Sequence, residues 1–167
     1  MAELRLPVRR TASALAVLLL VTTGLTGCSR SKSYCSTIGV DRLQLTTLSA
    51  DIGKPGQAGA DALRKAVTVL SGLRDEAPDD ISDEWVTLVA ALQGLVDAFR
   101  QSGAAPGDFA GGTLPEGVTA GQYDAVQQAV AELQSTRVQQ AGKSIEQHAQ
   151  DVCQVDLGPG GLGGLGG

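Results

Sequence analysis

Aromatic side chains are scarce in this sequence. Its 167 residues include one Trp, two Tyr and two Phe, which make up 3% of the chain. Strands depend on aromatic and β-branched side chains more than helices do. A core built mainly from Leu, Val, Ile and Ala therefore favours packed helices over a sheet. The length is that of one domain with a short leader.

Basic residues are also few. The chain has 13 Lys and Arg against 18 Asp and Glu, a net charge of −5. Residues 1–27 contribute +2, from three Arg and one Glu, so the remaining 140 residues carry 10 basic and 17 acidic side chains, a net charge of −7. Nucleic-acid binding depends on neutralising phosphates. We therefore expect no nucleic-acid partner for so acidic a domain.

Recognisable catalytic motifs are missing as well. His148 is the only histidine, and a histidine base needs a nucleophile and an orienting acid. No Ser or Cys stands in a nucleophile motif, so a partly exposed helix histidine is the better interpretation. One His and two distant cysteines do not have metal-ligand spacing. We expect a protein that is not an enzyme and has no metal site and no cofactor.

The first 27 residues have the three parts of a secretory signal peptide: a positive start, an apolar run over 11–23 and small residues over 24–27. The apolar run is shorter than the roughly 20 residues that span a bilayer. The pattern predicts cleavage after residue 27, and a retained membrane anchor is the alternative.

The segment Leu25-Thr26-Gly27-Cys28 resembles the lipobox of bacterial lipoproteins, in which a hydrophobic residue and two small ones precede the lipidated cysteine. The resemblance implies cleavage before Cys28, a diacylglyceryl group on its sulfur, and a location on the outer face of the cytoplasmic membrane. Two acyl chains make a stable anchor where one is marginal. Residues 28–34 would then be a membrane tether, roughly 20 Å long if extended.

Lipidation of Cys28 would leave Cys35 and Cys153 as a pair. Outside the cytoplasm such a pair tends to oxidise. A disulfide requires the two Cα atoms to lie about 5.5 Å apart, so the start and the end of the domain would have to meet. Two free thiols are the alternative.

Five segments have apolar residues at helical spacing: 36–52, 58–75, 79–102, 119–133 and 136–153. Thr119-Ala120-Gly121-Gln122 has the spacing of a capping box at the start of the fourth helix. The last two segments are separate because the apolar pattern slips after Leu133, and Ser135 is the predicted N-cap of the fifth helix. Trp85 is the predicted core anchor of the third.

Three other segments give less regular patterns. The acidic run 79–84 is typical of a helix start, where carboxylates complement the helix dipole; a calcium loop is the alternative, although the EF-hand pattern is absent. Residues 103–118 contain five Gly and two Pro and predict a mobile loop. Residues 158–167 form a glycine-rich tail, predicted to be disordered or to pair with a partner.

Together these patterns predict an all-α, up-and-down bundle of four to five helices over residues 35–157, stapled by one disulfide between Cys35 and Cys153. The chain is similar to a group of small helical lipoproteins of actinobacteria. The similar motifs are the lipobox, Tyr34-Cys35, Ala77-Pro78 before Trp85, and Cys153-Gln154-Val155-Asp156-Leu157. Gln154 stands where that group is expected to have Gly. No activity is known for the group, so the resemblance implies anchoring and fold alone.

We expect a non-enzymatic binding or interaction module, held at the membrane by the lipid on Cys28, with an envelope protein as a candidate partner. A small-molecule or lipid carrier is one alternative and requires an apolar cavity, expected near Trp85 and Tyr123. A non-catalytic accessory subunit of a cell-wall enzyme is the other, and requires an exposed apolar patch. With the disulfide end toward the membrane, the Pro78 turn or the 103–118 loop is expected at the opposite end.

Overall fold

The computed structural model of the protein describes residues 25–158 and Leu162. These residues form five α-helices, one short 3-10 helix and no strand: α1 (Leu25–Ile52), α2 (Gln57–Glu76), α3 (Ser82–Ser102), η1 (Pro106–Phe109), α4 (Ala120–Leu133) and α5 (Thr136–Asp151). The prediction of an all-α fold is confirmed. The signal segment before residue 25 and most of the glycine-rich tail lie outside the described residues, so the predictions made for them stay predictions.

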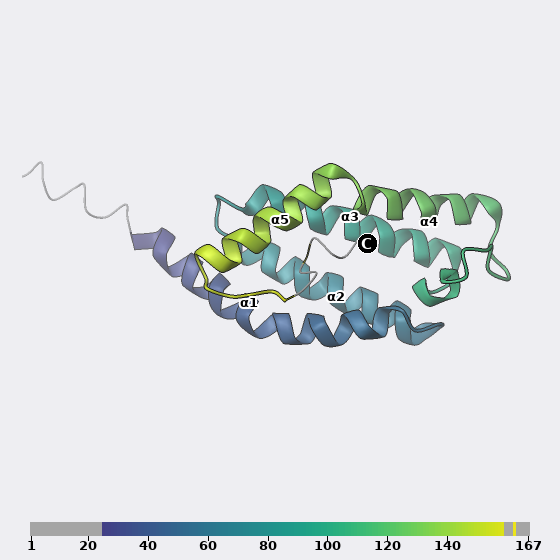
Figure 1. Ribbon diagram of the computed structural model, residues 1–167, viewed down its shortest axis with the longest axis horizontal. Coiled ribbons are helices and arrows are strands. Elements are labelled where there is room, and N and C mark those ends of the chain that lie inside the picture. The colour runs from purple at the N-terminus through teal and green to yellow at the C-terminus, as the bar shows by residue number, and fades with distance from the viewer. Residues whose placement is uncertain (1–24, 159–161, 163–167) are drawn as a thin grey trace, which may run out of the picture.

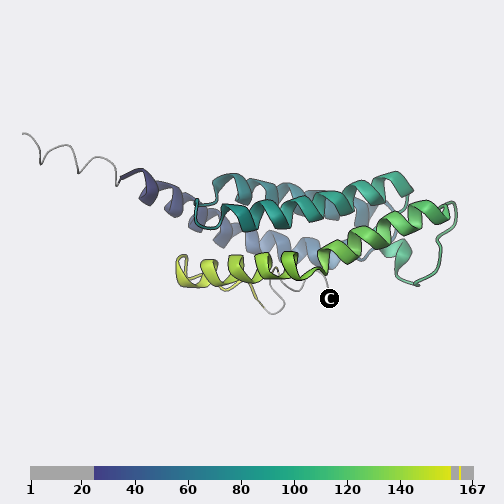
Figure 2. The ribbon, with the colours of Figure 1, turned by 90° about the horizontal axis from the view of Figure 1, so that it is seen from above.

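The helices occupy four positions in the bundle. α1, α2 and α3 run antiparallel to their neighbours, and α4 and α5 follow one another along α3 (Figures 1 and 2). The break between α4 and α5 falls where the apolar pattern slips. Ser135 caps α5, because its Oγ accepts a hydrogen bond from the Val138 amide at 3.3 Å. The predicted break is confirmed, and the two helices fill the fourth position one after the other.

The two ends of the bundle hold different connections. We call the end with Cys35 and Cys153 the stapled end and the other the far end. The Pro78 turn lies at the stapled end, where the neighbouring Asp80 approaches His148 of α5, whereas the 103–118 loop lies at the far end (Figure 1). Pro78 is thus wrong as a candidate for the far end, because two antiparallel helices return the chain to the end where it started.

The first helix begins earlier than the sequence predicted. α1 starts at Leu25 and not at Ser36. The segment 28–36 has no Pro or Gly to stop a helix, and near its end the Ser33 and Thr37 hydroxyls donate to the Glu76 carboxylate at 3.2 and 2.8 Å. The proposed tether is consequently helical, about 10 Å long between Cys28 and Cys35. The first turns of α1 project past the other helices (Figures 1 and 2).

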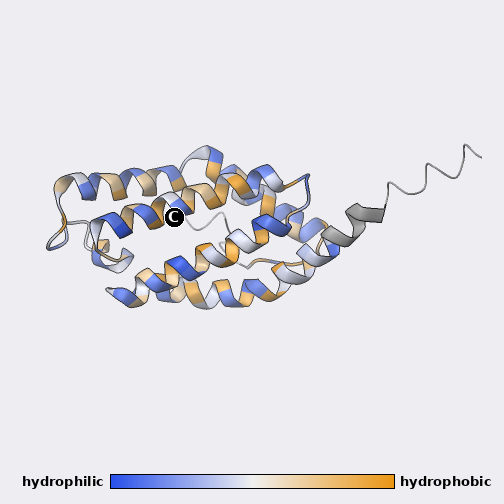
Figure 3. Cartoon of the chain, turned by 180° about the vertical axis from the view of Figure 1, so that it is seen from behind, coloured by the Kyte–Doolittle hydropathy of each residue, from blue (hydrophilic) through white to orange (hydrophobic). Residues whose placement is uncertain are grey.

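The core is mainly aliphatic. Hydrophobic and hydrophilic residues alternate along each helix (Figure 3), as amphipathic packing requires. Trp85 is completely buried, which confirms its role as a core anchor. The largest fully buried side chains are Trp85, Tyr34, Ile38, Leu70, Leu73, Leu88, Ile145, Val89 and Val126.

Part of the 103–118 connection packs against the bundle, which its composition did not predict, while residues 110–114 are exposed. Its mobility stays a prediction. The connection contains η1, whose Phe109 ring lies 5.3 Å from the ring of Phe99 and stacks 5.8 Å from that of Tyr123. The Tyr123 hydroxyl also donates to the Gly112 carbonyl at 3.1 Å. Glycine content predicted flexibility, whereas the long-range aromatic contacts that hold the segment are not visible in its local sequence.

Candidate functional site

The two partners of the disulfide come from opposite ends of the domain sequence. Cys35 lies on α1 and Cys153 just after α5, with their Cα atoms 4.9 Å apart and a sequence separation of 118. The predicted pairing is confirmed. A bond that closes a loop of this length contributes about 5 kcal/mol in the chain-entropy model. The bond therefore fixes the N-terminal part of α1 to the last helix of the bundle.

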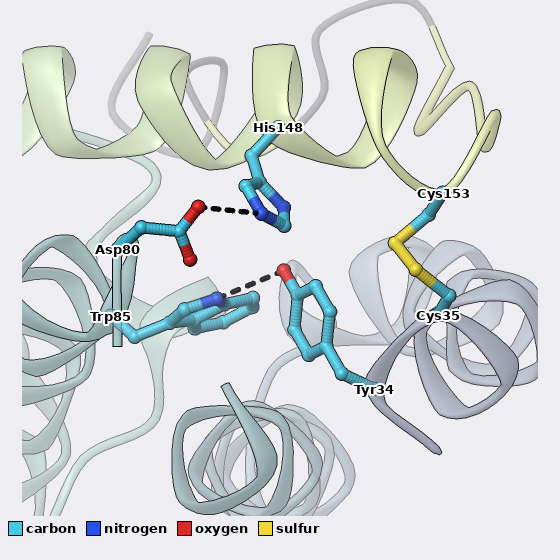
Figure 4. The surroundings of a disulfide bond; sticks show 6 residues. All are labelled: Tyr34, Cys35, Asp80, Trp85, His148 and Cys153. Carbon is cyan, nitrogen blue, oxygen red and sulfur yellow. Dashed lines mark hydrogen bonds and ion pairs between the residues drawn. A yellow bond between two sulfur atoms is a disulfide. The ribbon is translucent and has the colours of Figure 1, made fainter. Parts of the chain in front are cut away.

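A buried hydrogen bond lies beside the disulfide. Trp85 Nε1 donates to the Tyr34 hydroxyl at 3.0 Å, and both side chains are 0% exposed. Their rings meet edge to face (Figure 4). Burial raises the pKa of Tyr34 above its usual 10.0, with a smaller contribution from the Asp80 charge, while the hydrogen bond from Trp85 opposes the rise. This hydrogen bond was not predicted from the sequence, because its partners are 51 positions apart and leave no local pattern.

His148 belongs to the same cluster. Its side chain is 10% exposed, so it is more buried than predicted, and the imidazole points from α5 toward the Tyr34 ring (Figure 4). Nε2 lies 3.6 Å from Asp80 Oδ2, close enough for an ion pair when the ring is protonated. Within the described part of the chain, the buried Nδ1 has no hydrogen-bond partner. The histidine thus packs against the stapled end.

The lipobox residues lie in the first turn of α1. Leu25-Thr26-Gly27-Cys28 has a helical backbone, and its side chains are outside the described part of the structure. Cys28 precedes Cys35 by about two helical turns. No helix among residues 25–158 is long and apolar enough to cross a membrane. Cleavage and lipidation at Cys28 stay predictions.

Metal-ligating side chains do not gather in the described structure: over residues 25–158 and 162, no group of three or more His, Cys, Asp and Glu side chains could hold an ion. A calcium loop was the alternative for the acidic run 79–84, and the structure places its carboxylates in two different elements. Asp79 and Asp80 stand in the turn after Pro78, and Asp83 and Glu84 lie in the first turn of α3. The latter pair complements the helix dipole there.

An apolar cavity of about 290 Å³ lies between α1, α2, α3 and the segment after α5. It is not near Trp85 and Tyr123, where the carrier alternative required one. Trp85 is packed in the solid core, and Tyr123 stacks on Phe109 at the far end. The residues that line the cavity are Arg42, Leu45, Thr46, Ser49, Ile52, Leu63, Ala66, Val67, Leu70, Leu92, Leu157, Gly158 and Leu162.

Leu162 closes part of this cavity. It is the one described residue beyond Gly158, and its side chain is 9% exposed and packs with the core. The glycine-rich composition predicted that the tail buries too little apolar surface to become ordered. Its leucines are the only signal that could have indicated a contact with the bundle.

Two other depressions are more polar. One lies at the far end, between the start of α2 and the end of α3, and the other is a groove between α3 and α5 lined by charged and amide side chains. The apolar cavity is therefore the described site best suited to a hydrophobic ligand.

No protein-family model matches the chain, and searches of curated proteins and of solved structures found no match.

Proposed function

We propose that this protein is a lipid-anchored, non-enzymatic binding protein on the outer face of the cytoplasmic membrane. The observation that carries the proposal is the disulfide between Cys35 and Cys153. Such bonds persist in oxidising compartments and are rare in the cytosol. The pairing uses two of the three cysteines and leaves Cys28, the lipobox cysteine, available for lipid.

The position of Cys28 supports an orientation. The residue is the fourth of α1, and the first turns of this helix project beyond the stapled end (Figure 1). A lipid there would place the stapled end toward the membrane and the 103–118 loop away from it. A domain of net charge −7 gains no attraction from anionic headgroups. Attachment would therefore depend on the acyl chains.

A carrier of a small apolar molecule is the second candidate function, and the apolar cavity favours it. The accessory alternative has less support, because it requires a contiguous exposed apolar patch. The large exposed hydrophobic side chains are distributed over α1, α3, the far-end loop and the end of α5: Val40, Leu43, Val86, Leu114 and Val152.

Cys28→Ala tests the anchor. We expect the wild-type protein in the membrane fraction, labelled by a radioactive fatty acid, and the variant in the medium without label. Ser29→Ala serves as the matched control, because it leaves the lipobox intact and should behave as the wild type. A Cys28→Ala protein that stays membrane-bound and carries label would contradict the proposal.

A further inference from the structure

The apolar cavity has space for a hydrocarbon chain. Apart from Arg42, Thr46 and Ser49, the side chains that line it are aliphatic ones from α1, α2, α3 and the C-terminal segment. Its volume of about 290 Å³ is nearly twice the roughly 150 Å³ of an apolar protein cavity that binds benzene. That space suits one alkyl chain, whereas a two-chain lipid would need a larger site.

The polar residues of the lining all come from one face of α1, at Arg42, Thr46 and Ser49. The Thr46 hydroxyl donates to the Arg42 carbonyl and the Ser49 hydroxyl to the Thr46 carbonyl, both at 2.8 Å. The two hydroxyl hydrogens are therefore satisfied by the helix backbone. Arg42 is the only charged residue in the lining.

Arg42 also differs from the other arginines whose side chains the structure describes. Four of them form ion pairs with carboxylates: Arg64, Arg74, Arg100 and Arg137. Arg42 instead donates one hydrogen bond, from Nη1 to the Asp156 carbonyl at 2.8 Å. A guanidinium group has five N–H donors, and its planar fork matches carboxylates and phosphates. In a domain with an excess of acidic residues, an arginine that has no carboxylate partner among residues 25–158, at the edge of an apolar cavity, is suited to an anionic ligand.

We propose that the cavity binds a single-chain amphiphile with an anionic headgroup, with the alkyl chain between α1, α2 and α3 and the headgroup at Arg42. This inference rests on the proposed function as an extracytoplasmic binding protein and names its ligand class. A free fatty acid and a single-chain phospholipid share this chemistry. Leu157 and Leu162 would contact the bound chain from the C-terminal side.

Calorimetric titration of the full chain carrying Cys28→Ala, which lacks acyl chains of its own, tests the ligand class. The probes are dodecanoate, dodecanol and dodecylammonium below their aggregation concentrations, and lysophosphatidylglycerol in a separate arm. We expect one site for dodecanoate, and binding by the alcohol and the amine that is weaker by about tenfold or more, because a charge-assisted hydrogen bond contributes about 1.5–3 kcal/mol. The stronger of the two anionic probes identifies the source of the headgroup. Equal affinity for all four probes would contradict the proposal that the site selects an anionic headgroup.

Two pairs of variants locate the site. Arg42→Gln should weaken dodecanoate binding by about tenfold or more and leave dodecanol binding unchanged. The control Arg100→Gln alters an exposed arginine that does not line the cavity and should bind as the parent protein does. An effect of Arg42→Gln equal to that of its control would contradict the headgroup position.

Ser49→Trp places a large ring at the cavity edge, and Thr47→Trp places the same ring on an exposed part of α1 outside the lining. Both residues are exposed, so both variants should fold, which circular dichroism checks. We expect Ser49→Trp alone to weaken dodecanoate binding. Unchanged dodecanoate binding in both variants, or no binding of any probe to the parent protein, would contradict the proposal that the cavity is the binding site. The anchor proposal is tested separately by membrane fractionation, so either can fail while the other holds.

Discussion

The two ends of the bundle and the middle of the α1–α2 layer differ in the size of the side chains that fill them. All five aromatic residues of the chain lie at the ends: Tyr34 and Trp85 at the stapled end, and Phe99, Phe109 and Tyr123 at the far end. Between them the layer is filled by Leu, Val, Ile and Ala, and there the apolar cavity lies. A chain with few aromatic side chains thus fills its ends with large rings, while its smaller aliphatic residues leave a space between the helices.

Removing the disulfide should weaken the stapled end most. The double change Cys35→Ser and Cys153→Ser opens a loop closed over a sequence separation of 118 and should lower the free energy of unfolding by about 5 kcal/mol. Urea denaturation measures the loss. Cys28→Ser is the matched control and should cost nothing measurable, because that residue is outside the disulfide. Equal stability of the double variant and the control would show that the bond does not hold this end.

Tyr34→Phe should have the next largest effect. It keeps the ring and removes the acceptor of the buried Trp85 Nε1–H. An unsatisfied buried donor costs about 1–3 kcal/mol. The matched change at the far end is Tyr123→Phe, which removes a more exposed hydroxyl from the Gly112 carbonyl and should cost less. The denaturation midpoints of the two variants compare the two ends directly. A greater loss of stability in Tyr123→Phe than in Tyr34→Phe would contradict this expectation.

The Tyr34 hydroxyl also predicts that the free energy of unfolding depends on pH in the alkaline range. Burial raises the pKa of Tyr34 above 10.0 in the folded protein, so the neutral phenol is favoured there. Below pH 10 both states keep the proton and this contribution is fully present. As the pH rises past 10, the unfolded chain releases its proton first, and the free energy of unfolding falls until the folded pKa is reached. Urea denaturation at pH 9 and 11 should show a greater loss in the wild type than in Tyr34→Phe. Identical losses would contradict this account.

The smallest expected change in stability is that of Ala66→Leu, which compares the packing of the cavity with that of the solid core. Ala66 lines the cavity, whereas Ala98 is buried in α3 outside its lining. Ala66→Leu should fill empty space and stabilise the protein by about 0.5–2 kcal/mol. Ala98→Leu should overpack the core and destabilise it by about 1–3 kcal/mol. Thermal denaturation gives the sign of each change, and two changes of the same sign would mean that the two regions do not differ in packing.

Local patterns predicted the features that depend on neighbouring residues. Thr119 caps α4 through a capping box, in which its hydroxyl accepts from the Gln122 amide and the Gln122 side chain accepts from the Thr119 amide. Ser135 caps α5 at the predicted break. Each involves residues three positions apart, so a short stretch of sequence contains all of the information. The start of α1 was missed, because polar residues without a breaker fit a helix and a tether equally well.

The sequence by itself determined the helical class, the break between α4 and α5, the buried Trp85 and the pairing of Cys35 with Cys153. These follow from periodicity, local caps and the count of cysteines. Only the tertiary structure decided the contacts of Phe109 and the position of the apolar cavity beside Arg42. Both depend on how side chains from distant segments fill space together, and the spacing of residues along one helix does not report that volume.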